Sequence, residues 1–210
     1  MMITEPAIKR AVTFADGQNL FYAVREAFGY TYPNYDVLAL SRTICRSHGW
    51  HLSDVYFYTG IPDSVDNPSW HHFWSAKLRS MSRQGIHVFS RPLRYRNQTV
   101  KLPNGSTHTF LVGQEKGVDV RLSIDVVRKA MRNEFDVAVL FTQDQDLSEV
   151  AEEIREIASE QGRWILVASA YPVSPTTSNR RGVNKTDWIK IDRATYDACI
   201  DPYDYRPKSP

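Results

Sequence analysis

The chain has 210 residues, of which 42% are hydrophobic and 24% are charged, a balance typical of a globular domain with its own core. No apolar stretch reaches the roughly 20 residues that a membrane-spanning helix needs, and neither a linker nor an internal repeat divides the sequence. The formal net charge of +2 is too small to indicate a polyanionic partner by itself. We therefore expect one domain over residues 1–210 with its core at about 11–200 and no membrane association.

The cysteines and the N-terminus indicate a reducing compartment. Cys45 and Cys199 lie far apart and show no metal-ligand spacing, which argues against a zinc site or a disulfide framework. The segment MMITEPAIKR has no apolar run before Lys9 and Arg10, unlike a secretory signal. A cytoplasmic location is expected.

The first part of the sequence alternates strand and helix patterns. Residues 11–15, AVTFA, form a short apolar run before Asp16 and Gly17, typical of a buried parallel strand and its turn. Helical spacing predicts a helix over 18–28 and another that follows Asn34 as its N-cap and ends near residue 48. A strand over 52–60, a helix over 69–84 and a strand over 86–90 come next.

A different pattern follows over residues 91–114, where polar and apolar residues alternate on both sides of Asn104 and Gly105. An Asn-Gly pair at such a position is a strong signal for a hairpin turn. We expect a β-hairpin that leaves the main sheet.

The second part returns to strands and helices. It predicts a helix over 117–131, a strand over 136–142, a helix over 146–162 that ends at Gly162, and a strand over 164–170. Repeated strand and helix units with short connections favour a three-layer α/β/α sandwich with a mostly parallel, Rossmann-like sheet, to which the hairpin is added. The proline-rich tail 201–210 is expected to be disordered.

Acidic residues follow two of the predicted strands. Ligands of open α/β sheets bind beyond the carboxyl ends of the strands, near the point where the strand order reverses. Asp16 follows one strand, and Asp144 and Asp146 follow another. Asp119 is expected to point toward the same region and to share a helix face with Glu115, four residues earlier, whereas Asp125 lies about 240° round from it.

Each of these acids also has a structural explanation. Asp146 and Glu149 have the spacing of a helix capping box, Asp16 fits a turn, and Asp119 fits a solvated charge. Capping by Asp146 leaves Asp144 unexplained, and neither G-x-x-x-x-G-K-[ST] nor G-x-G-x-x-G occurs. Acids without a phosphate-binding loop indicate a hard divalent cation, Mg²⁺ or Mn²⁺.

Three motifs in this order, FADGQN (14–19), EKGVDVRLSID (115–125) and LFTQDQDLSEV (140–150), together resemble the NYN domain family, the LabA-like branch of the PIN-like nucleases. The stretch 180–200 resembles the same family, so that the likeness extends from about residue 11 to 200. The resemblance implies a PIN-like fold and a metal-dependent endonuclease that usually acts on RNA and leaves 5′-phosphate and 3′-hydroxyl ends. The catalytic and metal-binding acids that it implies are Asp16, Asp119, Asp144 and Asp146.

The resemblance also implies supporting residues. Asn19 would support the first strand turn, and Lys116 would contact the scissile phosphate or balance charge. The family pattern S-G-D-x-D is altered, because Thr142 replaces the serine and Gln143 replaces the glycine. Glutamine lacks the backbone freedom of glycine, so the geometry of this loop is expected to differ from that of the family.

Basic and aromatic residues supply a candidate surface for RNA, single-stranded or structured. Arginine interleaved with tyrosine suits phosphate pairing and base stacking, although a solvated charged hairpin would have the same composition. The candidates are Arg91, Arg94, Tyr95, Arg96 and Lys101 on the hairpin, and Arg180, Arg181 and Lys185 further on. The cluster Trp70, His71, His72 and Trp74 is interpreted as a core-facing helix and not as catalytic.

Two other functions fit this sequence less well. A Mg²⁺-dependent phosphatase with an aspartyl nucleophile is disfavoured, because its D-x-D would follow the first strand, where Gly17 and Gln18 stand after Asp16. A degenerate NYN module that binds RNA or a protein without cleavage stays open. A homodimer, a restraining protein partner, and a role in RNA processing, growth arrest or defence are all compatible with the sequence.

Overall fold

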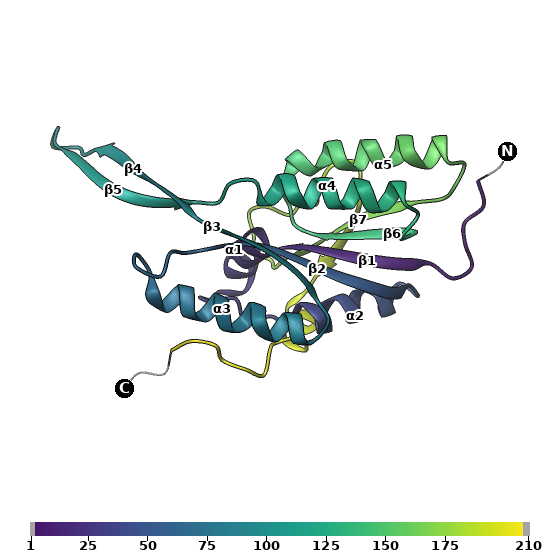
Figure 1. Cartoon of the computed structure of the whole chain (residues 1–210), viewed down its shortest axis with the longest axis horizontal. Coiled ribbons are helices and arrows are strands. Elements are labelled where there is room, and N and C mark those ends of the chain that lie inside the picture. Colours follow the sequence, from purple (N-terminus) through teal and green to yellow (C-terminus); the bar gives the residue numbers. More distant parts are fainter. Residues whose placement is uncertain (1–2, 208–210) are drawn as a thin grey trace.

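The computed structural model of the chain describes residues 3–207, and its centre is a sheet of six strands in the order β3-β2-β1-β6-β7-β8 (Figure 1). Every pairing in this sheet is parallel, as expected for repeated strand and helix units. The strands are β1 (Arg10–Asp16), β2 (His51–Ile61), β3 (His87–Pro92), β6 (Val137–Phe141), β7 (Leu166–Pro172) and β8 (Asp187–Ile191).

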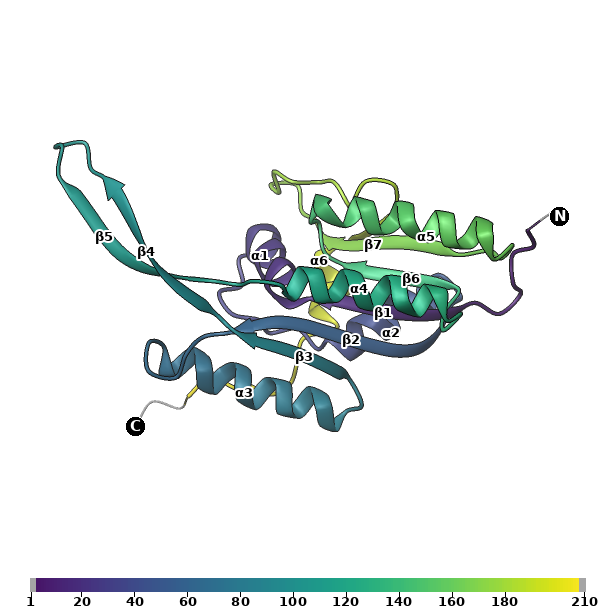
Figure 2. The same cartoon turned by 45° about the horizontal axis from the view of Figure 1, so that its top comes forward.

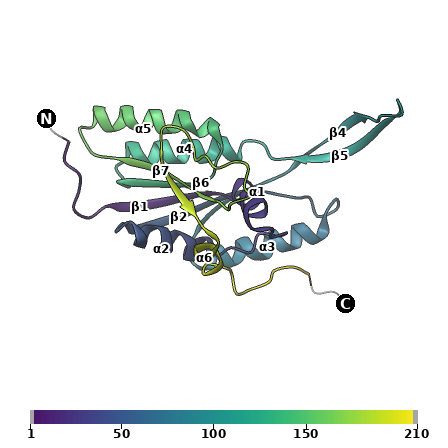
Figure 3. The same cartoon turned by 180° about the vertical axis from the view of Figure 1, so that it is seen from behind.

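Helices cover both faces of the sheet (Figures 1 and 3). One face carries α1 (Gly17–Phe28), α2 (Val37–Ser47), α3 (Pro68–Arg83) and α6 (Arg193–Asp197), and the other carries α4 (Val118–Met131) and α5 (Ser148–Glu160). In β1, Ala11 and Ala15 belong to the first apolar cluster whereas Val12 and Phe14 belong to the second, as the two-residue period of a strand requires. The predicted α/β/α sandwich is confirmed.

The hairpin forms a separate antiparallel sheet of β4 (Arg94–Lys101) and β5 (Thr107–Gln114). It projects from the body beyond the end of β3 (Figure 2). Gly105 adopts φ +83, which glycine allows without steric cost and which the tight turn needs. The predicted excursion from the main sheet is confirmed.

Several local predictions were wrong. The N-cap of α2 is Asp36, whose carboxylate accepts hydrogen bonds from two backbone N–H groups at the start of the helix, whereas the Asn34 amide oxygen accepts from the buried Tyr196 hydroxyl. The last strand and helix, β8 and α6, were not predicted. In the short edge strand β8 most side chains are exposed, Trp188 among them, so its apolar signal is weak.

The C-terminal segment packs beside α3. The buried Lys77 ammonium donates to the Asp201 carboxylate over 2.9 Å and to the Tyr35 carbonyl over 2.8 Å. Arg206 lies over the ring of Tyr32, 4.0 Å from its centroid. The predicted disorder of 201–210 stays a prediction, and residues 208–210 lie outside the described residues. Within 3–207, none of the helices combines the length and the apolar character needed to cross a membrane.

Candidate active site

The site lies where the strand order reverses. The chain passes from β1 to β2 and β3 on one side of the sheet and later adds β6, β7 and β8 on the other side of β1. The carboxyl ends of β1 and β6 therefore flank the position at which open α/β sheets bind ligands. Asp16 is the last residue of β1, and Asp144 follows β6 by three residues.

Asp16 caps helix α1. Its carboxylate accepts hydrogen bonds from the backbone N–H groups of Gln18 (3.1 Å) and Asn19 (3.0 Å). Burial, with a smaller contribution from the charges of Asp144 and Asp119, raises the pKa of Asp16 to about 6, although the two backbone N–H groups lower it. Asp16 thus both caps a helix and takes part in a cluster of interacting acids.

Gly17 is required by packing. A Cβ atom at this position would lie 2.4 Å from the ring of Phe57, so a larger residue would displace the start of α1 or the ring. This close approach explains why glycine follows aspartate in the D-G-x-N motif.

The loop after β6 is held by side chains on both sides. The carboxylate of Asp144 accepts from the backbone N–H of Asp146 (3.1 Å), and the backbone N–H of Asp144 donates to the hydroxyl of the buried Thr142 (3.1 Å). The amide oxygen of Asn19 accepts from the backbone N–H of Gln143 (2.9 Å). Asn19 and Thr142 therefore fix the loop that carries Asp144.

The predicted capping box at Asp146 is wrong. A short 3₁₀ helix, η1 (Gln145–Leu147), precedes α5 and is capped by Asp144, while α5 begins only at Ser148 without a side-chain cap. Asp146 lies inside η1 and is exposed.

The third contribution comes from the start of α4. Gly117 adopts φ +75 as the N-cap, and Asp119 stands in the first turn of the helix. Glu115 precedes this turn, so the helix face that it was predicted to share with Asp119 does not exist. As predicted, Asp125 points elsewhere, and its buried carboxylate accepts from the Tyr58 hydroxyl over 3.1 Å.

These acids meet in one open cleft of about 520 Å³. Asp16, Glu115, Asp119 and Asp144 line it, together with the predicted supporting residues Asn19 and Lys116 and with Gln18, Tyr22, Gly117 and Val120. Asp146 does not line it. Three of the four acids predicted from the sequence are thus brought together.

Glu115 is the site residue that the sequence prediction omitted. Its carboxylate accepts from the backbone N–H of Gly60 (2.5 Å), and a Cβ on Gly60 would lie 2.8 Å from the same carboxylate. Burial and the charges of Asp16 and Asp119 raise the pKa of Glu115 to about 7, although the hydrogen bond from Gly60 lowers it. No local sequence signal marks it, because its place depends on the contact with Gly60 on β2.

The donor set of the cleft is chemically suited to a hard cation, because all four acids offer oxygen ligands of the kind that Mg²⁺ and Mn²⁺ prefer. In the present arrangement the side chains are spread around the cleft. Within residues 3–207, no three His, Cys, Asp or Glu side chains lie close enough together to hold one ion. Two carboxylates about 4 Å apart repel by roughly 4 kcal/mol at an effective dielectric near 20, which opposes closer clustering without a cation.

The arginines of the hairpin and Tyr95 lie on opposite faces. The Tyr95 hydroxyl accepts from the backbone N–H of Asp63 over 3.0 Å. Because side chains alternate along a strand, Arg94 and Arg96 lie on the face opposite Tyr95. Arg91 stands nearer the acids, because its guanidinium would lie 2.8 Å from a Cβ on Gly117, which lines their cleft. Arginine and tyrosine alternate in the sequence, but in the structure they lie on two different surfaces of the hairpin.

The second basic stretch is largely engaged in internal contacts. The Arg180 guanidinium donates to the Thr177 carbonyl (3.0 Å), and the Lys185 ammonium pairs with the Glu152 carboxylate (2.5 Å). Arg181 is exposed, and its guanidinium donates to the Asn184 side chain over 3.3 Å. Arg181 is thus the best placed of the three for an external phosphate.

Gln143 ties this stretch to the acidic loop. Its side-chain amide donates to the carbonyls of Asn179 (3.2 Å) and Arg181 (2.8 Å). Among residues 3–207, the non-glycine residues with positive φ are Asn133 and Lys185, so Gln143 does not need the backbone freedom of glycine. The altered family pattern therefore leaves the loop backbone unstrained.

Comparisons with known proteins agree with the resemblance seen in the motifs. The family model described as NYN domain matches residues 10–186. A crystal structure of a protein of unknown function from Vibrio parahaemolyticus superposes with a TM-score of 0.53 at 18% identity, covering 91% of this chain and 98% of that one, and has the same fold. A ribokinase from Giardia lamblia aligns at a TM-score of 0.31 and 11% identity over 60% of this chain and 36% of its own. No protein with a curated description matches the sequence.

Proposed function

This chain belongs to the NYN domain family of PIN-like nucleases, and we propose that it is a metal-dependent endoribonuclease that hydrolyses RNA phosphodiester bonds at the cleft between β1, β6 and α4. The observation that carries the proposal is the convergence of Asp16, Glu115, Asp119 and Asp144 on one cleft at the point where the strand order reverses.

The proposed ligand set for Mg²⁺ or Mn²⁺ is Asp16, Asp119 and Asp144. Such an ion, when bound, lowers the pKa of water and neutralises charge on a phosphate. Asp16 and Asp144 are oriented by backbone N–H groups, and Asn19 holds their two chain segments together. Asp146 contributes its backbone N–H to Asp144 and is not in the proposed ligand set.

Glu115 is proposed as the proton acceptor of the site. Its carboxylate lines the same cleft as the proposed metal ligands, and in the metal-free protein burial raises its pKa to about 7, close to the pH at which a general base is most effective. Lys116, the next residue, is exposed at the edge of the same cleft and is proposed to contact the scissile phosphate.

RNA is the proposed substrate, with Arg91 and Arg181 as further phosphate contacts beyond Lys116. A cytoplasmic setting is part of the proposal and agrees with the two buried, unpaired cysteines, Cys45 and Cys199. A homodimer or a restraining protein partner would add regulation to this activity.

The second candidate is an NYN module that binds RNA or protein without cleavage. It is favoured by one observation, namely that within 3–207 no three acidic side chains already lie close enough to hold an ion. The shared cleft favours the nuclease, because burial and neighbouring carboxylates raise the pKa of Asp16 and Glu115, which makes this group of acids costly to retain in a pure binding surface.

Cleavage of end-labelled single-stranded RNA and DNA tests the proposal directly. The wild type, Asp16→Asn and Asp144→Asn are each incubated with Mg²⁺, Mn²⁺ or EDTA, and Asp187→Asn, at an exposed position on β8, is the matched control. We expect cation-dependent cutting of RNA by the wild type and the control, with loss in both site variants. Binding of RNA by all four proteins without cutting under any condition would favour the binding module.

A further inference from the structure

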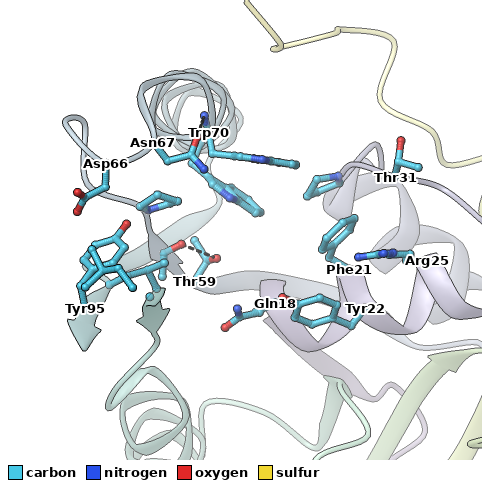
Figure 4. Close-up of a pocket in the computed structure, with 17 residues that line it drawn as sticks. Gln18, Phe21, Tyr22, Arg25, Thr31, Thr59, Asp66, Asn67, Trp70 and Tyr95 are labelled. Carbon is cyan, nitrogen blue, oxygen red and sulfur yellow. Dashed lines mark hydrogen bonds between the residues drawn. The ribbon is translucent and has the colours of Figure 1, made fainter. Parts of the chain in front are cut away.

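A second cleft of about 570 Å³ lies between α1, α3 and the base of the hairpin (Figure 4). It shares Gln18 and Tyr22 with the first cleft, which is lined by Asp16, Glu115, Asp119 and Asp144 and is called the acidic cleft below. These two residues are four apart on α1 and therefore lie on one helix face. The two clefts are thus neighbours along a single surface of α1.

The walls of the second cleft are aromatic. Phe21 and Tyr22 come from α1, Trp70 and Trp74 from α3, and Tyr95 from β4. Figure 4 shows Trp70, Tyr22 and Tyr95 on three sides of an open space. The Phe21 and Trp70 ring centroids are 6.4 Å apart, so these rings join α1 to α3.

The aromatic rings of the second cleft are more exposed to solvent than those of an ordinary core. The core position predicted for Trp74 is confirmed, with 7% of its surface exposed, whereas Tyr22 is 54% exposed and Trp70 is only half-buried. On the hairpin side, a Cβ on Gly113 would lie 3.0 Å from the Tyr95 ring, so glycine leaves room for that ring to lie across β5. The cleft is therefore built with rings that present surface to solvent.

Polar groups stand between these rings. Gln18, Thr59 and Asn67 line the cleft, and Arg25 brings a guanidinium to it from the next turn of α1 after Tyr22. A cleft of this volume is within the usual range of roughly 300–1,000 Å³ for small-molecule sites. Asp66 also lines the cleft, on the side opposite Arg25 (Figure 4). The combination of aromatic faces, amides and one arginine suits a nucleobase whose phosphate lies on the Arg25 side.

We propose that this second cleft binds an unpaired base of the RNA substrate, next to the phosphate held over the acids. The base stacks on Tyr22 and Trp70, and Arg25 contacts a backbone phosphate. Bases in a duplex have both faces covered by their neighbours, so the cleft selects single-stranded segments, loops or bulges. The inference rests on the proposed function and specifies its substrate class.

Position-specific fluorescence tests the proposal. Single-stranded RNA oligonucleotides that each carry one 2-aminopurine, at successive positions, are titrated with the Asp144→Asn protein in Mg²⁺, and the bond cut by the wild type is mapped on the same sequence. We expect a change in emission confined to positions beside that bond, because stacking on an aromatic ring alters 2-aminopurine fluorescence.

Variants of the cleft supply the comparison. Tyr22→Leu and Trp70→Leu, each added to Asp144→Asn, are expected to abolish the position-specific change and to weaken binding by about tenfold. The matched control is Trp50→Leu, because Trp50 is also half-buried and stacks on His48 at 4.6 Å, before the start of β2. Tyr22 is exposed, so its replacement leaves the fold intact, which far-ultraviolet circular dichroism verifies.

The outcomes separate this inference from the proposed function. Emission changes that are uniform along the oligonucleotide, or that persist in both cleft variants, overturn the base-binding cleft even if the wild type cuts RNA. A position-specific change that depends on Tyr22 and Trp70, in a protein that cuts nothing with any cation, supports the cleft and overturns the nuclease.

Discussion

The amide oxygen of Asn19 accepts a hydrogen bond from the backbone N–H of Gln143 over 2.9 Å, although the two residues are 124 positions apart. The backbone N–H of Asn19 also donates to the carboxylate of Asp16. One residue therefore contacts both strand ends that carry the acids. The D-G-x-N motif acquires a physical explanation from this, since aspartate caps α1, glycine fits against Phe57 and asparagine bridges to the second acidic loop.

Replacement of Asn19 by alanine is expected to lower both stability and activity. The backbone N–H of Gln143, a residue that is 9% exposed, would lose its partner, which costs about 1–3 kcal/mol. Urea unfolding measures the stability, and the rate of RNA cleavage is compared at a temperature where both proteins are folded. Asn97→Ala, on the exposed hairpin, is the control. Normal cleavage by folded Asn19→Ala would show that the bridge serves only the fold.

Gly17→Ala is expected to destabilise the protein by about 1–3 kcal/mol, because the added Cβ would lie 2.4 Å from the Phe57 ring. If the ring is the obstacle, the double variant Gly17→Ala with Phe57→Leu should be more stable than the sum of the two single changes predicts. A double-mutant cycle by urea unfolding measures this difference. Strict additivity would mean that the backbone of α1, and not the ring, resists the larger residue.

The strand ends and the helix start could be predicted from sequence because their signals are local. Asp16 and Asp144 each follow an apolar run, and parallel strands bring their carboxyl ends to one edge. The place of Glu115 could not be predicted in this way, since it depends on Gly60, a residue 55 positions earlier on a different strand.

Other errors have equally specific causes. The capping-box spacing at Asp146 was satisfied by the sequence, but Asp144 begins a separate 3₁₀ turn that competes for the same position. The second cleft depends on distant rings, such as Phe21 and Trp70, that meet only when α1 and α3 pack on the same face of the sheet. Composition alone favoured a core position for Trp70 and could not show how much of its ring reaches solvent.

Metal-free protein is expected to lose stability as the pH rises from about 4 to 7. The pKa of Asp16 is raised to about 6 and that of Glu115 to about 7, so in this window the folded state binds more protons than the unfolded state does. The contribution of these groups is complete below the pKa of the unfolded carboxyl groups and is lost as the pH passes the folded values. Urea unfolding in EDTA at successive pH values measures the slope.

The variants isolate this effect from other carboxylates. Asp16→Asn and Glu115→Gln should each make stability fall less steeply with pH than in the wild type. If Mg²⁺ binds the cleft, adding it should restore the stability of the wild type above pH 7. Parallel pH profiles for wild type and both variants would show that the two acids titrate normally in the folded protein.

The two acids of the D-x-D motif are expected to differ sharply in cleavage. Asp144 lines the acidic cleft, whereas Asp146 is exposed and supplies only its backbone N–H to the Asp144 carboxylate. Because Asp146→Asn keeps that N–H, its kcat/KM on single-stranded RNA should stay within a few-fold of the wild type. Asp144→Asn and Glu115→Gln, which remove a carboxylate from the cleft, should lose at least about a hundredfold. An equal loss in Asp146→Asn would instead place its side chain on the ion, which requires η1 to rearrange when the cation binds.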